Sequence, residues 1–69
     1  MAALSMNPKA EMVERFLDFA ARGDKEKVTS MISNSSFLIN QSSENGWTAL
    51  MLAARNGHFE VVKTLLAKG

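Results

Sequence analysis

Hydrophobic residues recur at helical spacing near the start of the chain, with charged residues between them. The apolar residues lie on one face of a predicted helix: Met12, Val13, Phe16, Leu17 and Ala20. Apolar residues three and four positions apart are typical of an amphipathic helix. The Asn7-Pro8 pair favours a helix start, because proline fits the first turn, and Gly23 favours a helix end. The pattern therefore predicts a helix that begins at this pair and ends before Gly23.

A second, shorter helix is expected directly afterwards. Asp24 is a suitable N-cap, because its carboxylate can accept a hydrogen bond from a first-turn N–H. The apolar face of this helix is formed by Val28, Met31 and Ile32. The polar run over residues 33–36 indicates an end near Asn34. The apolar residues 37–39 are expected to form a brief extended segment tucked under the helices.

The second half of the chain predicts a turn and two further helices. Asn45-Gly46 favours a hairpin turn, and Thr48 can cap a helix that starts at Ala49. Gly57 suits the left-handed residue that ends this helix. The apolar face of the third helix is predicted to contain Leu50, Ala53 and Ala54. The stripe of the fourth helix is predicted to contain Val61, Val62, Leu65 and Leu66.

The two halves match each other when Gly23 is aligned with Gly57, and we call this alignment the repeat register. It pairs identical or similar residues throughout: Phe16 with Leu50, Ala20 with Ala54, Gly23 with Gly57, Glu26 with Glu60, Val28 with Val62, Met31 with Leu65 and Ile32 with Leu66. Internal similarity at a fixed spacing predicts two copies of one supersecondary unit. The first copy has a longer and more charged leading helix, as expected of a capping unit at the end of a stack.

The second copy resembles the ankyrin repeat. Residues 42–69 contain Gly-x-Thr-x-Leu, Ala-Ala, Gly-His, Glu-Val-Val and Leu-Leu in the order of that family. The resemblance implies an all-α fold of ankyrin helical hairpins with a short β-hairpin finger, as an N-terminal cap plus one repeat with an incomplete C-terminal end. The expected organisation is a flexible N-terminus over residues 1–7, a capping unit over 8–40 and a repeat over 41–69. Three positions depart from the family, which usually has aspartate, proline and histidine where this chain has Ser43, Ala49 and Met51.

A narrower resemblance concerns the parent protein. Residues 42–51 and 53–58, with 20–24 and 39–40, look like the N-terminal ankyrin region of a member of the Nudix hydrolase family. The resemblance implies a parent that cleaves the pyrophosphate of NADH and of NAD caps on RNA, uses divalent metal and resides in peroxisomes. The Nudix box needs a glutamate six residues after a glycine, but Leu52 follows Gly46 and Lys63 follows Gly57 at that distance. The alternative is a small stand-alone regulatory ankyrin protein without an enzymatic parent.

Composition excludes several classes of function. The 69 residues carry a net charge of +1 without a basic patch, so neither nucleic acid nor a membrane surface is an expected partner. Cysteine is absent, and no apolar run approaches the roughly 20 residues that span a bilayer. The start lacks the features of a signal peptide, so an intracellular location, in the cytoplasm or the peroxisome, is expected. No catalytic, metal-binding or cofactor-binding residue is predicted, and His58 is assigned a structural role in the turn between helices.

The expected function is binding of a protein partner through the finger and the inner helix, which is the helix predicted to start at Ala49. Trp47 is the leading candidate, since an exposed tryptophan is a common interface anchor. It could instead fold back onto residues 37–39 or the neighbouring finger. The other candidates, at positions that ankyrin proteins vary to choose partners, are Glu44, Asn45, Arg55 and Asn56. The alternative for each of these four, and the one favoured for each taken alone, is a solvated surface residue. The C-terminal face, around Val61 and Leu65, lacks a packing partner and is expected to support self-association.

Overall fold

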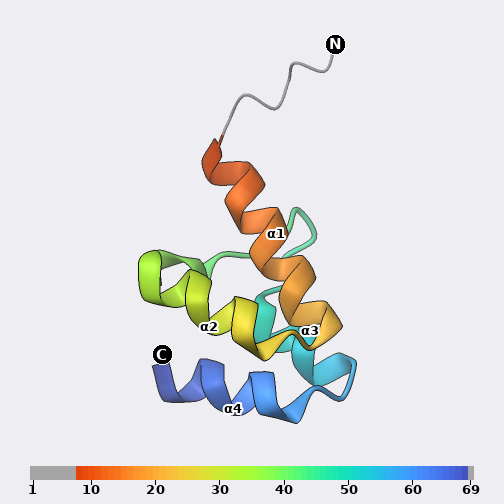
Figure 1. Cartoon of the computed structure of the whole chain (residues 1–69). Coiled ribbons are helices and arrows are strands. Elements are labelled where there is room, and N and C mark those ends of the chain that lie inside the picture. Colours follow the sequence, from red (N-terminus) through yellow and green to blue (C-terminus); the bar gives the residue numbers. More distant parts are fainter. Residues whose placement is uncertain (1–7, 69) are drawn as a thin grey trace.

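The computed structural model describes residues 8–68, which form two stacked helical pairs (Figure 1). The elements in chain order are α1 (Pro8–Arg22), α2 (Lys25–Asn34), the 3-10 helix η2 (Ser36–Asn40), α3 (Ala49–Arg55) and α4 (Phe59–Lys68). α1 packs on α2 and α3 on α4 within the pairs, while α1 contacts α3 and α2 contacts α4 between them. The predicted all-α fold of helical hairpins is confirmed. The predictions of a flexible segment over residues 1–7 and of a cap at Asn7 lie outside the described residues.

The helices end where the predicted capping residues lie. Gly23 and Gly57, which follow α1 and α3, have φ angles of +81° and +78°. Such positive φ values strain residues that carry a Cβ, and this explains glycine at both turns. The side chains of Asp24 and Thr48 accept hydrogen bonds from first-turn N–H groups of α2 and α3, at 3.2 and 3.3 Å. Local capping chemistry therefore defines the helix boundaries.

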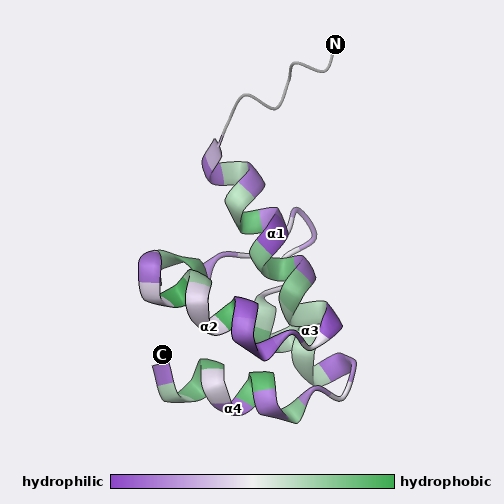
Figure 2. Ribbon diagram, viewed as in Figure 1, coloured by the Kyte–Doolittle hydropathy of each residue, from purple (hydrophilic) through white to green (hydrophobic). Residues whose placement is uncertain are grey.

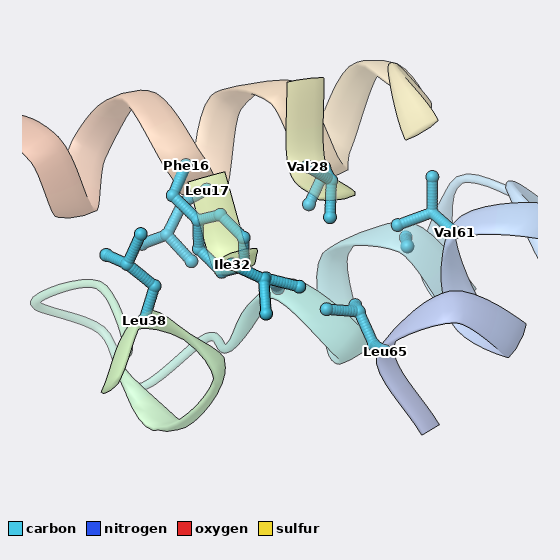
Figure 3. Close-up of a cluster of buried hydrophobic side chains, with 10 residues drawn as sticks. Phe16, Leu17, Val28, Ile32, Leu38, Val61 and Leu65 are labelled. Atoms are coloured by element: carbon cyan, nitrogen blue, oxygen red, sulfur yellow. The ribbon is translucent and has the colours of Figure 1, made fainter. Parts of the chain in front are cut away.

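An apolar core lies between the two helical pairs (Figure 3). Its buried residues are Phe16, Leu17, Ala20, Val28, Ile32, Leu38, Ala49, Ala53, Val61 and Leu65. Within residues 8–68 no polar or charged residue is buried. Figure 2 shows hydrophilic and hydrophobic residues alternating along the helices, as expected where each helix buries only part of its surface.

The segment over residues 37–39 is helical, so the prediction of an extended segment was wrong. These residues belong to η2, in which the N–H of Leu38 donates to the carbonyl of Ser35 and that of Gln41 to the carbonyl of Leu38, both at 3.1 Å. The Leu38 side chain is fully buried beneath Phe16 (Figure 3). A tight helical turn satisfies backbone groups locally while it directs one leucine into the core, which an isolated extended segment could not do.

The backbones of the two pairs match in the predicted repeat register. The N–H of Gly23 donates to the carbonyl of Ala20, and that of Gly57 donates to the carbonyl of Ala54, both at 3.2 Å. The buried side chains follow a different alignment, which is shorter by a single position. The buried pairs are Phe16 with Ala49, Ala20 with Ala53, Val28 with Val61, and Ile32 with Leu65. The two pairs therefore bury different sides of their helices, because each buried side must face the other pair.

One side of α3 and α4 is consequently covered only in part. We call it the open face, and it carries Leu50, Ala54, Val62 and Leu66. Leu50 and Val62 are half-buried, whereas Leu66 is 63% exposed. The predicted stripes of α3 and α4 thus divide into a buried side and this open face. The expectation of an unpacked face around Val61 and Leu65 was wrong, because both side chains are buried against the first helical pair.

Two polar contacts join the turns of the helical pairs. The side-chain amide of Asn56 donates to the carbonyl of Ala21 at 3.0 Å, linking the end of α3 to the end of α1. The ammonium group of Lys25 lies 3.5 Å from the carboxylate of Glu60, between the starts of α2 and α4. Both partners of this ion pair are exposed, so its contribution to stability is small.

His58 packs directly on Gly23. A Cβ placed on Gly23 would lie 2.5 Å from the imidazole Nδ1, which is closer than real Cβ contacts allow. The histidine therefore occupies the space that a side chain at position 23 would need. Gly46 and Gly57 differ, because a Cβ on either of them would meet no atom within 4 Å.

Candidate interaction surface

Residues 42–48 form a short hairpin that we call the finger. Ser42 and Thr48 form an isolated antiparallel bridge, and the N–H of Ser43 donates to the carbonyl of Trp47 at 2.9 Å. Gly46 has a φ of +84°, which completes the tight turn. The finger runs beside α1 in Figure 1 and leads directly into α3. Its position is therefore fixed relative to the first turn of α3.

Ser43 organises the finger from within. Its Oγ accepts hydrogen bonds from the N–H groups of Asn45 at 3.3 Å and of Trp47 at 3.2 Å. A serine hydroxyl can accept two such bonds, as the carboxylate usual at this position in the family would. This departure from the family pattern is therefore compatible with an ordered finger.

An exposed row of Trp47, Met51 and Arg55 lies along α3, and we call it the α3 row. Met51 and Arg55 are four residues apart in α3 and share one side of that helix, and Trp47 precedes the helix, at the end of the finger. Trp47 is 37% and Met51 49% exposed, and the guanidinium carbon of Arg55 lies 5.1 Å from the centroid of the Trp47 ring. This distance is that of a cation–π contact, which joins the indole to the last residue of α3.

The remaining candidate residues flank the α3 row. Glu44 and Asn45 are exposed in the finger. Asn56 is also exposed, but its amide donates to the carbonyl of Ala21, so this side chain already links the helical pairs. The candidate residues therefore all lie within residues 44–56. Asn56, at the end of this segment, is held by its hydrogen bond to Ala21.

A groove of about 560 Å³ separates the finger from α1. Its α1 wall includes Val13, Glu14 and Leu17, and its other wall is formed by residues 41–45. The groove therefore presents both apolar and polar groups. Within the described range 8–68, the structure contains no cluster of three or more histidine, aspartate or glutamate side chains that could hold a metal ion.

Met51 is the surface residue that sequence reasoning missed. The sequence pattern marks it only as a departure from the family, although its spacing of four residues from Arg55 in the predicted helix is a usable signal. No helix among residues 8–68 is both long and apolar enough to cross a membrane. The finger and the α3 row together present exposed aromatic, thioether, amide and charged groups.

Comparisons with known proteins agree with this architecture. The family model described as ankyrin repeats, in three copies, matches residues 1–69. The chain is 54% identical over all of its 69 residues to the NAD-capped RNA hydrolase NUDT12 of Macaca fascicularis, and 52% identical to that of Homo sapiens. It spans 15% of the length of each of these relatives.

A more distant relative is a different ankyrin-repeat protein. Ankyrin repeat domain-containing protein 40 of Mus musculus is 36% identical over 59 residues, which are 86% of this chain and 16% of that protein. No solved structure matches the chain. The stacked helical hairpins, the finger and the family match over the whole chain show that this protein belongs to the ankyrin-repeat family.

Proposed function

We propose that the chain is a protein-interaction module whose binding surface is the finger and the α3 row. The proposed contact residues are Glu44, Asn45, Trp47, Arg55 and Asn56, joined by Met51. The observation that supports the proposal is the exposed α3 row, in which Arg55 holds the Trp47 ring by a cation–π contact. Tryptophan and arginine are enriched among residues that dominate interface energies, and methionine is enriched in interfaces. Residues 8–40 would act as the capping unit and 41–69 as the repeat that presents this surface.

The geometry makes Trp47 the expected energetic centre. Its ring is already held against Arg55, so binding would cost little additional side-chain entropy. Truncating a central tryptophan at an interface typically costs about 2–4 kcal/mol, which is a loss of about 30- to 1,000-fold in affinity. Loss of Glu44 or Asn45 should matter less, because exposed polar residues at the rim contribute little.

The test compares Trp47→Ala with a matched control, Phe59→Ala, which truncates an aromatic residue that is 70% exposed on α4. Proteins retained by the immobilised chain are identified by mass spectrometry, and one is then purified and titrated by calorimetry. The proposal expects that partner to bind the Phe59→Ala variant normally and the Trp47→Ala variant at least about 30-fold more weakly. Equal binding by both variants would refute it, provided that circular dichroism shows both to be folded.

We also propose that the chain is the N-terminal ankyrin region of a Nudix-type hydrolase that acts on NADH or NAD-capped RNA. Identity of 52–54% over the whole chain to NAD-capped RNA hydrolases supports this proposal. The catalytic domain would lie outside these 69 residues, and the parent would be intracellular, in the cytoplasm or the peroxisome. Sequencing the transcript beyond codon 69 tests the proposal. A Nudix box is expected, and an ankyrin array without one would favour the stand-alone regulatory alternative.

A third proposal concerns the isolated chain, which should self-associate through the open face. The apolar residues Leu50, Val62 and Leu66 support it, because contiguous exposed apolar surface favours association. Sedimentation velocity should detect dimers that the variant Leu66→Asp lacks. A monomer at all tested concentrations would contradict this proposal.

A further inference from the structure

The groove between α1 and the finger exists because α1 is about twice as long as α3. α1 has 15 residues and α3 has 7, so the first turns of α1 lie beside the finger and past the end of α3 (Figure 1). The space between them has a volume of about 560 Å³, which is within the range of pockets that hold small ligands. The lining residues include no member of the α3 row, so the groove is a separate surface.

An apolar strip lies along the α1 wall of the groove. Ala10, Val13 and Leu17 are spaced three and four residues apart, which places them in a line on one side of the helix. With a rise of about 1.5 Å per residue, this strip is about 10 Å long. An extended chain advances about 3.3 Å per residue, so the strip matches about three residues of an extended peptide. Ala10 is exposed and Val13 is half-buried, so the strip can still gain apolar contacts.

Two carboxylates stand on opposite walls of the groove. Glu14 lies on the α1 wall and Glu44 on the finger wall, and both are exposed. Neither carboxylate forms an ion pair with another of residues 8–68. Lys9 also lines the groove, but its ammonium group lies 5.2 Å from the centroid of the Phe37 ring, which belongs to η2. A cationic group in the groove would therefore be attracted by both walls.

The finger wall also presents main-chain groups at its edge. The bridge between Ser42 and Thr48 is accompanied by the hydrogen bond from the N–H of Ser43 to the carbonyl of Trp47, so the N–H and C=O of Ser42 point to the other edge of the hairpin. Neither of these groups is hydrogen-bonded to the backbone of another of residues 8–68, and Ser42 lines the groove. An exposed strand edge of this kind can pair with an added extended chain.

We infer that the groove binds an extended, basic segment of a partner protein. The segment would lay apolar side chains on the strip of α1, pair its main chain with Ser42, and place an arginine or lysine between Glu14 and Glu44. Arginine fits best, because its guanidinium group has several donors in a fixed plane and can serve two carboxylates. The same carboxylates disfavour anionic ligands such as nucleotides. This inference rests on the proposed role of the finger as a binding surface, and it names the chemistry of the partner.

A displayed library of short random linear peptides is the probe for this site. The library is depleted on the double variant Glu14→Gln/Glu44→Gln and then selected on the native chain. Both glutamates are exposed, so the double variant should keep the fold, which circular dichroism checks. The retained peptides should share a basic residue next to apolar ones. Retained sequences without a common basic residue, or the absence of any retained peptide, would overturn the inference.

One retained peptide is then labelled and titrated by fluorescence polarisation. Glu14→Gln and Glu44→Gln should each weaken its binding about fivefold, the effect of one ion pair at a partly exposed site. Glu11→Gln is the matched control, because it makes the same charge change at an exposed position of α1 that does not line the groove. The control should change the affinity by less than about twofold, since distant surface charges are screened by salt. Equal effects of all three variants would refute the inference.

Changes in the peptide test its two other contacts. Glutamine in place of the basic residue should weaken binding to the native chain and make binding insensitive to Glu14→Gln and Glu44→Gln. Methylation of the peptide nitrogens, one at a time, should abolish binding at the nitrogen that donates to the carbonyl of Ser42. The inference fails if the neutral peptide still responds to both substitutions, or if no nitrogen is sensitive to methylation.

The outcomes keep the groove separate from the proposed α3 row. The partner found in the Trp47→Ala test is titrated against the Glu14→Gln/Glu44→Gln variant. Normal binding by this variant overturns the groove inference, whatever Trp47→Ala does. Weakened binding by this variant, together with equal binding by Trp47→Ala and Phe59→Ala, supports the groove and refutes the α3 row. If the retained peptides match segments of this chain and dissociate its dimers in sedimentation velocity, a second copy is the occupant and the inference fails.

Discussion

The contact between His58 and Gly23 leads to a prediction in which three glycines of similar backbone conformation respond differently to the same substitution. Gly23, Gly46 and Gly57 have φ angles of +81°, +84° and +78°, so alanine is strained at each of them. A left-handed conformation costs a residue with a Cβ about 1–2 kcal/mol. Gly46→Ala and Gly57→Ala should therefore lower the free energy of unfolding by about that amount.

Gly23→Ala should cost more, because its new Cβ would lie 2.5 Å from the Nδ1 of His58. The imidazole would have to move, and forcing extra atoms into a packed site typically costs about 1–3 kcal/mol. The expected total is about 2–5 kcal/mol, against about 3–10 kcal/mol of stability for a domain of this size. The variant should therefore be partly unfolded, or close to it, at room temperature.

The assay is urea unfolding followed by circular dichroism, with a double-mutant cycle between positions 23 and 58. His58→Ala should cancel the excess cost of Gly23→Ala and leave only the cost of the left-handed backbone. It should not change the cost of Gly46→Ala. The reasoning is refuted if all three alanine variants lose the same stability, or if His58→Ala leaves the excess at position 23 unchanged.

Substitutions at three further positions test the core, the finger and the exposed ion pair. Leu38→Ala should lower the free energy of unfolding by about 3–5 kcal/mol, because it empties a fully buried site; a loss below about 1 kcal/mol in calorimetry would place this side chain outside the core. Ser43→Ala should cost about 1–2 kcal/mol and broaden the NMR signals of the finger, since two N–H groups lose their acceptor, whereas Ser43→Asp should preserve the order. Glu60→Gln should change stability by less than about 0.5 kcal/mol, and a larger, salt-sensitive loss in chemical denaturation would show that its pair with Lys25 is stronger than its exposure implies.

The helix boundaries were predictable because short-range chemistry determines them. Gly23 and Gly57 end helices through backbone conformation, and Asp24 and Thr48 begin them through side-chain hydrogen bonds. These effects involve residues within one turn of each other, so the amino-acid sequence reports them directly. The conformation of residues 37–39 depends instead on the distance that the chain must cover between α2 and the finger, and an apolar triplet does not encode it.

The burial of individual apolar residues was less predictable. The stripe on α4 contains Val61 and Leu65, which are buried, as well as Val62 and Leu66, which belong to the open face. In a stacked unit both sides of a helix can be apolar, so periodicity alone does not tell which side meets the neighbouring pair. For the candidate interaction surface, the sequence motif located Trp47, and only the exposure of Met51 on the side of α3 that carries Arg55 added Met51.

The unequal lengths of α1 and α3 affect the dynamics of the groove beside the finger. α1 has 15 residues and α3 has 7, so the first turns of α1 extend past α3 alongside the finger (Figure 1). Residues 8–11 are exposed there, whereas the first buried residue of α1 is Phe16. Local opening of a helix end requires far less free energy than global unfolding. Amide hydrogens at the start of α1 should therefore exchange through fraying, so one wall of the groove can widen while the core remains intact.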